Sequence, residues 1–559
     1  MGFFGVLEDK KLSHVPGTVI LNEEVADSDN LTTALKHSSG KDSHIILVPQ
    51  PSDDPNDPLN WSATKKFIII LIVGLGTIIN AATIGPLLNA GLYTISLDFH
   101  TSIGDITLIS GYQLLVAGAS GPIVSACSRK WGKRPCFLFS TLFAVIGTIV
   151  GSATNSYNGL LAARIIQGCS ISAYESLVIA LIGDLYFVHQ RGGFNSGIQF
   201  LLGGISNFSS VLAGPITANL GWKYLFHILI AFVGTQIIML FFFCPETSYI
   251  REARYNIDEI ADEDLGNLAA AEKVDETRVE LSQNTDANLT SSPTIASSRT
   301  SIPAPKTFWQ QTAIFTGTYS DENLLQLIIA PFAVCTNLAV FWVVVVSGTL
   351  TATYVAQAYV LAQIFSSPPY NLDASGIGYL SLGPFIGGLV ASIFWGFTLD
   401  PMIRWATIKN KGVYEPEYRL LAMVGALFIG IGLMAFGMMA EKHISYYATA
   451  TAHGIALFGV ICATISTSAY ALDAYRGMSN EIFIAGMVFK NFMFYGFSYF
   501  VNDWTARAGP AEVFYVFGGV AFFLTLTTPI VFIWGKCYRS FWHRHNLLEK
   551  FNIRTHAEF

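Results

Sequence analysis

The sequence predicts an all-α membrane protein with about twelve transmembrane helices in two six-helix, pseudo-symmetric bundles. Three observations lead to this fold class. Of the 559 residues, 52% are hydrophobic and 13% are charged, whereas a soluble protein has about 25% charged residues. Long apolar stretches recur along the chain, each long enough to cross a bilayer as a helix. Two of them, one in each half, share a sequence pattern that indicates an internal repeat.

The elements follow in order along the chain. Residues 1–60 are polar, and we expect a cytosolic arm that is mostly disordered. An N-terminal six-helix bundle is predicted within residues 61–245, with spans at about 67–92, 104–127, 135–154, 160–182, 194–218 and 224–244. Residues 246–323 are interpreted as a cytosolic central linker, partly disordered, whose part at 306–319 would form an interfacial helix. A C-terminal bundle is predicted within 324–536, with spans at about 324–350, 376–399, 419–439, 446–471, 481–503 and 512–535, before a cytosolic tail at 537–559.

Loop charges predict the orientation. Alternate loops are rich in Lys and Arg, and the loops between them are poor in both. Because cytosolic loops carry the excess of positive charge, both termini and the central linker are predicted to be cytosolic. The basic loops hold Arg129, Lys130, Lys133, Arg134, Arg191, Arg251, Arg254, Arg404, Lys409, Lys411, Arg419 and Arg476.

The stretch from Asn158 to Arg191 indicates the function. Its apolar middle contains Arg164 and Glu175, which in a helix lie roughly 16 Å apart on nearly the same face. A charge that faced lipid would cost several kcal/mol, so this face must point into a protein interior or a water-filled cavity. An ionisable stripe on a spanning helix is typical of a transporter. The alternative is a permanent structural ion pair with another helix.

The internal repeat relates the second and eighth spans. Aligned on Gly111 and Gly378, they share Gly-Tyr and, further on, one glycine and one serine. The fourth and tenth spans both end in an aspartate, so Asp184 and Asp473 correspond. Such repeats occur in transporters whose halves rock about a central site.

Several passages resemble the major facilitator superfamily, and within it the fungal twelve-span drug:proton antiporter-like branch. The loop CSRKWGKRP, with Arg129, Gly132, Lys133 and Arg134, resembles the loop motif after the second span. Arg164, Gln167 and Gly168 resemble the span-four motif, and Gly214-Pro215 followed by GWKYLF resembles the span-five antiporter motif. The PxNW segment before the membrane and the Pro-Glu-Thr after span six are familiar in fungal members. Two motifs depart from the family pattern: Arg129 stands at the usually acidic position of the loop motif, and Ala218-Asn219 follows in the span-five motif where two glycines are usual.

These passages suggest gating roles. Lys133 and Arg134 would bind a carboxylate at the end of a span, such as Asp184 or an acid of the other half, in one conformation and release it in another. Asp473 would act as a latch at the end of its helix. The simpler alternative is that the cations only set the topology. For Gly214-Pro215 we expect helix packing or bending.

Glu175 is the main candidate for coupling. A low-dielectric interior favours the protonated carboxyl group, so Glu175 would bind a proton and a cationic substrate alternately, and Arg164 would assist proton release. Lys490, inside the eleventh span, needs a partner. If it pairs with Glu175, the pair would lock the site, admit an anionic substrate or act as a conformational latch. The resemblance implies that spans one, four, seven and ten line a cavity, with candidate lining residues Asn80, Asn89, Asn337, Trp342, Tyr354, Gln357 and His453.

The predicted function is proton-coupled transport by alternating access, with export of a small organic molecule such as a drug, toxin or secondary metabolite. The first alternative is proton-coupled uptake of an organic cation such as a polyamine, and the second is a transporter-like nutrient sensor. We expect no enzyme, no cofactor and no metal site, since no ligand spacing or P-loop is found. The expected partners are a small-molecule substrate, protons and the lipid bilayer, with no nucleic acid. We expect a monomer in the plasma membrane.

Overall fold

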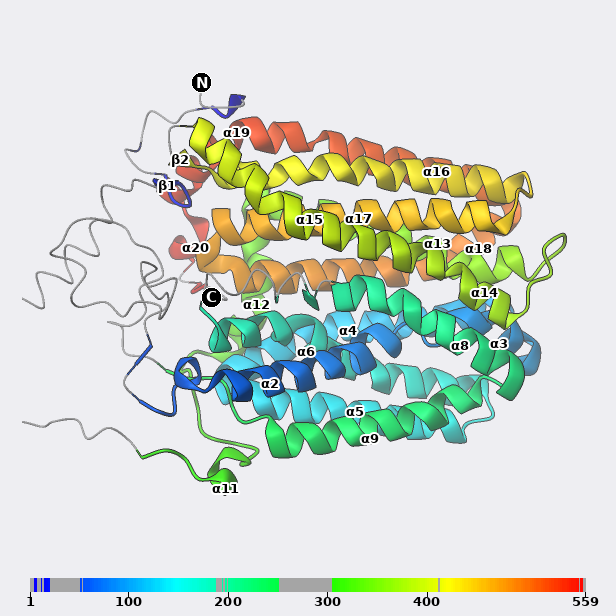
Figure 1. Ribbon diagram of the computed structural model, residues 1–559, viewed down its shortest axis with the longest axis horizontal. Coiled ribbons are helices and arrows are strands. Elements are labelled where there is room, and N and C mark those ends of the chain that lie inside the picture. Colours follow the sequence, from blue (N-terminus) through cyan, green and yellow to red (C-terminus); the bar gives the residue numbers. More distant parts are fainter. Residues whose placement is uncertain are drawn as a thin grey trace, which may run out of the picture.

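The computed structural model describes residues 5–7, 12, 15–20, 51–52, 54–187, 194, 197–198, 200–250, 304–410, 413–551 and 553–555. Within these ranges, eleven helical segments are long and apolar enough to cross a membrane. The last of them, Arg476–Lys550, contains two membrane-length parts, because the backbone at Gly509 has φ 83° and breaks the helix. The described chain therefore provides twelve spans, as the sequence predicts. Figure 1 shows the first six below the last six, with the helices running along the long axis.

The N-terminal bundle follows the predicted order with modest shifts. The first span ends at Thr83 rather than near residue 92, because Gly85 and Pro86 follow and a separate short helix then begins. Its helices are α2 (Ala63–Thr77), continued by the π-helix η4 (Ile78–Thr83), then η5 (Asn89–Gly91), α3 (Leu92–Phe99), α4 (Ile103–Trp131), α5 (Lys133–Ala153), α6 (Tyr157–Leu185), η6 (Leu201–Ile205), α8 (Ser206–Leu220) and α9 (Lys223–Phe243), preceded by η3 (Pro58–Asn60).

The C-terminal bundle shows one larger correction. The seventh span was predicted at 324–350, but α12 (Leu324–Ala333) is a separate short helix, and the span runs from Leu338 to Phe365 as α13. The side chain of Asn337 accepts hydrogen bonds from the backbone N–H groups of Ala339 and Val340, so a new helix begins there. The other elements are α11 (Phe308–Gln311), η8 (Val334–Thr336), α14 (Ala374–Leu380), α15 (Leu382–Lys409), η9 (Pro416–Ala426), α16 (Leu427–Glu441), α17 (Tyr446–Ala474), η10 (Arg476–Met478), α18 (Ser479–Leu526), α19 (Thr528–Arg544) and α20 (Leu547–Lys550).

The N-terminal arm is partly docked on the C-terminal bundle. β1 (Val19–Ile20) pairs antiparallel with β2 (Val413–Tyr414) in a two-stranded ribbon. The backbone N–H of Leu7 donates to the carbonyl of Ile533 on α19. The end of the molecule that carries β1, β2 and α20 is called the ribbon end below, and the end with α3 and α14 is called the far end (Figure 1).

The two bundles meet along two helix pairs. α4 packs against α18, and α8 packs against α14. At the second contact the backbones almost touch, since a Cβ added to Gly214 would lie 2.5 Å from the carbonyl oxygen of Ala374 and 3.0 Å from Cα of Gly378. These pairs join spans two with eleven and five with eight, which are equivalent under the repeat. Many large apolar side chains point outward, including Phe397 at 78% exposure, as expected for surfaces that face lipid.

Candidate functional site

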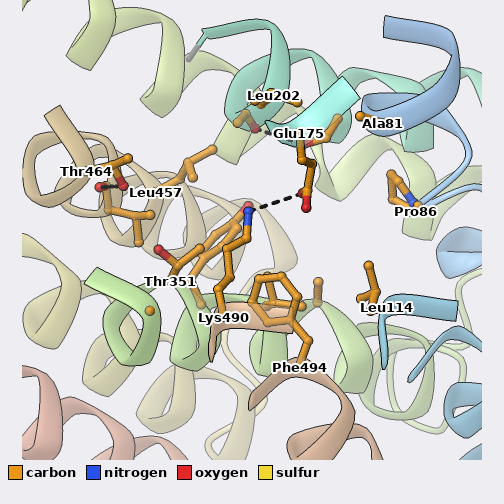
Figure 2. Close-up of a pocket in the computed structure, with 18 of the residues that line it drawn as sticks. Ala81, Pro86, Leu114, Glu175, Leu202, Thr351, Leu457, Thr464, Lys490 and Phe494 are labelled. Carbon is orange, nitrogen blue, oxygen red and sulfur yellow. Dashed lines mark hydrogen bonds and ion pairs between the residues drawn. The ribbon is translucent and has the colours of Figure 1, made fainter. Parts of the chain in front are cut away.

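A cavity of about 320 Å³ lies between the bundles. Residues from both halves line it, including Ala81 near the end of the first span, Ser110 and Leu114 of α4, and Glu175 of α6. The C-terminal half contributes α13, α17 and α18 (Figure 2). The lining is mostly apolar, with several small hydroxyl side chains. Among the described residues that line it, Glu175 and Lys490 carry opposite charges.

Glu175 and Lys490 form an ion pair inside this cavity. Nζ of Lys490 lies 3.1 Å from Oε1 of Glu175, and Nδ2 of Asn491 donates to Oε2 at 2.9 Å. Figure 2 shows the two side chains reaching toward each other across the open space. Their side chains remain 13% and 26% exposed. Because Glu175 belongs to α6 and Lys490 to α18, this pair links the N-terminal bundle to the C-terminal bundle.

Arg164 lies elsewhere, although it shares a helix face with Glu175. Its side chain is fully buried, and Nη1 donates to the carbonyl of Ile84 at 2.6 Å and to Oε1 of Gln167 at 3.1 Å. Gln167 in turn donates to the hydroxyl of Thr148 on α5. Arg164 is not among the residues that line the cavity. It ties α6 to the segment after the first span and, through Gln167, to α5.

The other candidate lining residues separate into two groups. His453, Tyr354 and Asn89 line the cavity. The ring of His453 lies 5.1 Å from that of Tyr354, whose hydroxyl donates to Oδ1 of Asn207 on α8 at 2.8 Å. This contact is a second polar link between the bundles.

The second group lies outside the cavity lining. Asn80 donates to the carbonyl of Gly76 in its own helix, and Trp342 donates to the hydroxyl of Thr527. Asn337 caps α13, as described above. Gln357 is fully buried, and neither of its amide atoms has a hydrogen-bond partner.

The loop motif forms a cluster at the ribbon end of the N-terminal bundle. Nζ of Lys133 lies 2.5 Å from Oδ2 of Asp184. The turn at Gly132 has φ 99° and is held by the carboxylate of Glu246, which accepts from the backbone N–H groups of Lys133 and Arg134 at 2.9 and 3.0 Å. The Arg134 guanidinium donates to carbonyls at the end of α9, including that of Phe241 at 2.7 Å.

Glu246 was not among the predicted site residues. It stands in the Pro-Glu-Thr segment, so that segment was a usable signal for a partner of the loop. The remaining motif residues lie at the end of a helix or where two helices pass closely. Arg129 lies in the last turn of α4. A Cβ on Gly168 would lie 2.4 Å from the carbonyl oxygen of Gln113, so α6 passes close to α4 there. Pro215 follows Gly214 inside α8, at the α14 contact.

The C-terminal bundle carries an equivalent cluster. Nε of Arg419 lies 2.8 Å from Oδ2 of Asp473, and the hydroxyl of Tyr414 donates to the same carboxylate. Burial and the nearby Asp473 carboxylate raise the pKa of Tyr414 well above its ordinary value, so this phenol stays neutral. Asp184 and Asp473 thus each form an ion pair with a basic side chain at the ribbon end, as their equivalence under the repeat suggests.

Next to this cluster lies a buried charged group that the sequence did not reveal. Arg539 of α19 contacts Glu415 at 2.9 Å and Glu417 at 2.8 Å, and all three side chains are at most 2% exposed. Lys536 contacts Glu415 at 2.6 Å. The hydroxyl of Thr18 in the N-terminal arm also donates to Glu415 at 2.8 Å. These contacts join parts of the chain hundreds of residues apart. No group of three or more His, Cys, Asp or Glu side chains suited to a metal occurs among the residues that the structure describes.

Two pseudo-symmetric helical bundles around a central cavity that holds an ion pair are typical of a secondary transporter. The chain belongs to the Major Facilitator Superfamily, whose family model matches residues 67–489. An uncharacterized MFS-type transporter of Schizosaccharomyces pombe is 26% identical and is aligned over 98% of this chain and 97% of its own length. Protein HOL1 of Saccharomyces cerevisiae is 23% identical over 97% and 98%, and the probable drug/proton antiporter YHK8 of the same yeast is 23% identical over 85% and 86%.

The solved structures agree with this fold. The partially occluded inward open conformation of the xylose transporter XylE from E. coli matches with a TM-score of 0.54 at 11% identity. The match covers 83% of this chain and 98% of XylE. At this identity the likeness concerns the fold alone. The protein is therefore a multi-pass integral membrane protein of this superfamily.

Proposed function

We propose that this protein is a proton-coupled transporter that exports a small organic molecule, such as a drug, toxin or secondary metabolite, by alternating access. The observation that carries the proposal is the ion pair between Glu175 and Lys490, which links the two bundles inside the cavity. An intramembrane charge of this kind is a functional candidate by default, because its burial is costly. The similarity to a probable drug/proton antiporter supports the direction of transport.

The pair suggests how a proton and a substrate compete. A proton on Glu175 removes the negative charge that holds Lys490, so the link between the bundles weakens. A substrate cation that approaches Glu175 from the cavity competes both with the proton and with Lys490. Binding of either one changes the relative free energy of the two conformations, which is the requirement for coupled transport. Lys490 then acts as an internal substitute for the substrate cation when the cavity is empty.

The two clusters at the ribbon end are proposed as gating elements. Lys133 with Asp184, and Arg419 with Asp473, hold the ends of neighbouring helices within each bundle. Each is partly exposed, so solvent screens it and its strength responds to small movements. We place the ribbon end, with both termini, in the cytosol of a plasma-membrane protein, because the basic loops lie there.

A second candidate is proton-coupled uptake of an organic cation such as a polyamine. Two observations favour it. The Glu175 carboxylate faces the cavity while still partly exposed, and Ala218-Asn219 stands where the antiporter motif has two glycines. The nutrient-sensor alternative concerns the central linker, of which residues 251–303 lie outside the described residues.

Transport of a labelled panel distinguishes these candidates. Ethidium, rhodamine 6G and spermidine would be followed in cells at two external pH values, with wild type, Glu175→Gln and the exposed control Glu512→Gln. We expect wild type and the control to lower the cellular content of at least one dye more strongly at acidic external pH, and Glu175→Gln to lose this dependence. Proton-driven accumulation of spermidine would instead favour uptake. Transport that is equally independent of pH in wild type and Glu175→Gln would contradict the coupling role.

A further inference from the structure

A second cavity lies on the outer surface near the ribbon end, away from the central cavity. It measures about 330 Å³ and is formed by the start of α2, the end of α9 and the short helix α11. In Figure 1, α11 stands apart from the bundle, next to the ends of α2 and α9. The segment that carries it is fixed by Arg134, whose Nη2 donates to the carbonyl of Thr312 at 2.9 Å. The proposed transport cycle gives this cavity no role.

The cavity has a polar side and an apolar side. Ser62, Thr64, Lys65 and Gln311 form the polar side. The apolar side consists of Ile68, Phe242, Phe243, Pro245 and Phe308. Phe242 and Phe243 are 41% and 57% exposed, so the apolar side continues onto the lipid-facing surface. A molecule that fills this cavity must therefore be amphipathic.

The polar side is cationic. Nζ of Lys65 donates to Oε1 of Gln311 at 3.1 Å and lies 3.7 Å from the centre of the Trp61 ring. Both partners are uncharged, and among the described residues no carboxylate lies within ion-pair distance of Lys65. Lys306, which is exposed, precedes α11. The residues that line the cavity include no Asp or Glu. An anionic group would therefore gain a charge-assisted contact here without repulsion from a lining carboxylate.

The surrounding aromatic residues fit the level of the lipid headgroups. Trp309 is 75% exposed, and Phe308 and Phe315 are 53% and 56% exposed. Aromatic side chains concentrate at the membrane–water interface, where an apolar ring lies next to polar groups. Lys65 precedes the lipid-facing residues Phe67 and Leu71 of the same helix by two and six residues, which is less than two helical turns. The ammonium group and the apolar surface thus follow one another in the order of a phospholipid's headgroup and acyl chains.

We propose that this cavity binds one anionic phospholipid, with the phosphate at Lys65 and the hydroxyl groups of Ser62 and Thr64, and an acyl chain along Ile68, Phe242 and Phe243. The lipid would fix α11 against the first and sixth spans. Because α2 continues into Ala81, which lines the central cavity, the site adjoins an element of the transport path.

Native mass spectrometry of the purified full-length protein tests this proposal. The protein would be delipidated in detergent and titrated with phosphatidylglycerol or phosphatidylcholine, for wild type, Lys65→Gln and the control Lys409→Gln. Lys409 is exposed in the last turn of α15 and is not among the residues that line this cavity. We expect one phosphatidylglycerol to bind to wild type and the control about fivefold more tightly than to Lys65→Gln, since one cation near the surface contributes about 1 kcal/mol.

Each other outcome contradicts part of the proposal. Equal binding of phosphatidylglycerol to wild type and Lys65→Gln would exclude the phosphate contact. Equal binding of the two lipids to wild type would mean that the surface selects no headgroup charge. Full displacement by millimolar inorganic phosphate would identify a free-anion site instead of a lipid site.

Discussion

The contact between α8 and α14 makes a specific prediction about the conformational cycle. If the bundles alternate between two arrangements, the far end must open when α8 and α14 separate. In the present structure Gly214 and Gly378 pass with their backbones in contact. Gly214→Val is therefore expected to destabilise this arrangement and to favour the one that is open at the far end.

The magnitude follows from the geometry. A Cβ at residue 214 would lie 2.5 Å from the carbonyl oxygen of Ala374, whereas carbon atoms in contact lie about 3.5–4.0 Å apart. The atom that the added Cβ would meet belongs to the backbone of Ala374. No side-chain rotation can relieve this clash, so the two helices must move apart. Overpacking of this kind costs about 1–3 kcal/mol. The ratio of the two conformations should change by roughly 5- to 150-fold.

Spin labels at Asn219→Cys on α8 and Tyr379→Cys on α14 would report this change by double electron–electron resonance, with the native cysteines replaced. Both positions are exposed. Gly396→Val is the matched control, because a Cβ there would meet nothing within 4 Å. We expect Gly214→Val to increase the population with the longer distance and the control to leave it unchanged. Identical distance distributions in the two variants would refute the assignment of this contact as the far-end closure.

Three further predictions concern the buried polar clusters. Arg539→Leu removes the cation that contacts buried Glu417 and one of the two cations that contact buried Glu415. It should lower stability by about 3–5 kcal/mol, seen as a large fall in the thermal unfolding temperature, whereas the exposed Arg507→Leu should have almost no effect. Gln167→Leu removes the amide that connects Arg164 to α5 and should cost about 1–3 kcal/mol by the same assay, and an unchanged unfolding temperature would contradict this role. The pKa of Tyr414 is raised in the folded protein above its ordinary value of 10.0. The neutral phenol therefore contributes stability fully at a pH below 10.0, and this contribution is lost as the pH rises toward the folded-state pKa. Tyr414→Phe should therefore lose less stability than wild type between about pH 9 and 11.

The sequence predicted most of the helices and offered the central pair as one of several alternatives. Apolar length located most of the spans, because each must be long enough to cross the bilayer, but the seventh begins at Leu338 and not at residue 324. The sequence suggests Glu175 as a possible partner of Lys490, since two intramembrane charges of opposite sign stabilise each other. The same reasoning did not distinguish Arg164 from Glu175. Helix periodicity gives both the same face, but near the far end that face packs against the segment at Ile84, and only deeper does it meet the cavity.

Contacts between segments that are distant in the sequence could not be predicted from the pattern of apolar residues. The cluster around Arg539 includes Thr18, which is separated from Glu415 by 397 positions along the chain. Periodicity describes one helix at a time and carries no signal for such a contact. The boundary at Asn337 was missed for another reason: apolar residues continue on both sides of it, and an Asn cap is a weak signal within a long apolar stretch.

The central claim is that the carboxyl group of Glu175 takes up and releases a proton during the transport cycle. Infrared difference spectroscopy of the reconstituted protein between about pH 5 and pH 8 tests it without knowledge of the substrate. Our account predicts a carboxylic-acid C=O band on acidification that is present in wild type and in Glu512→Gln and absent in Glu175→Gln. Difference spectra that are the same in all three proteins would contradict the account.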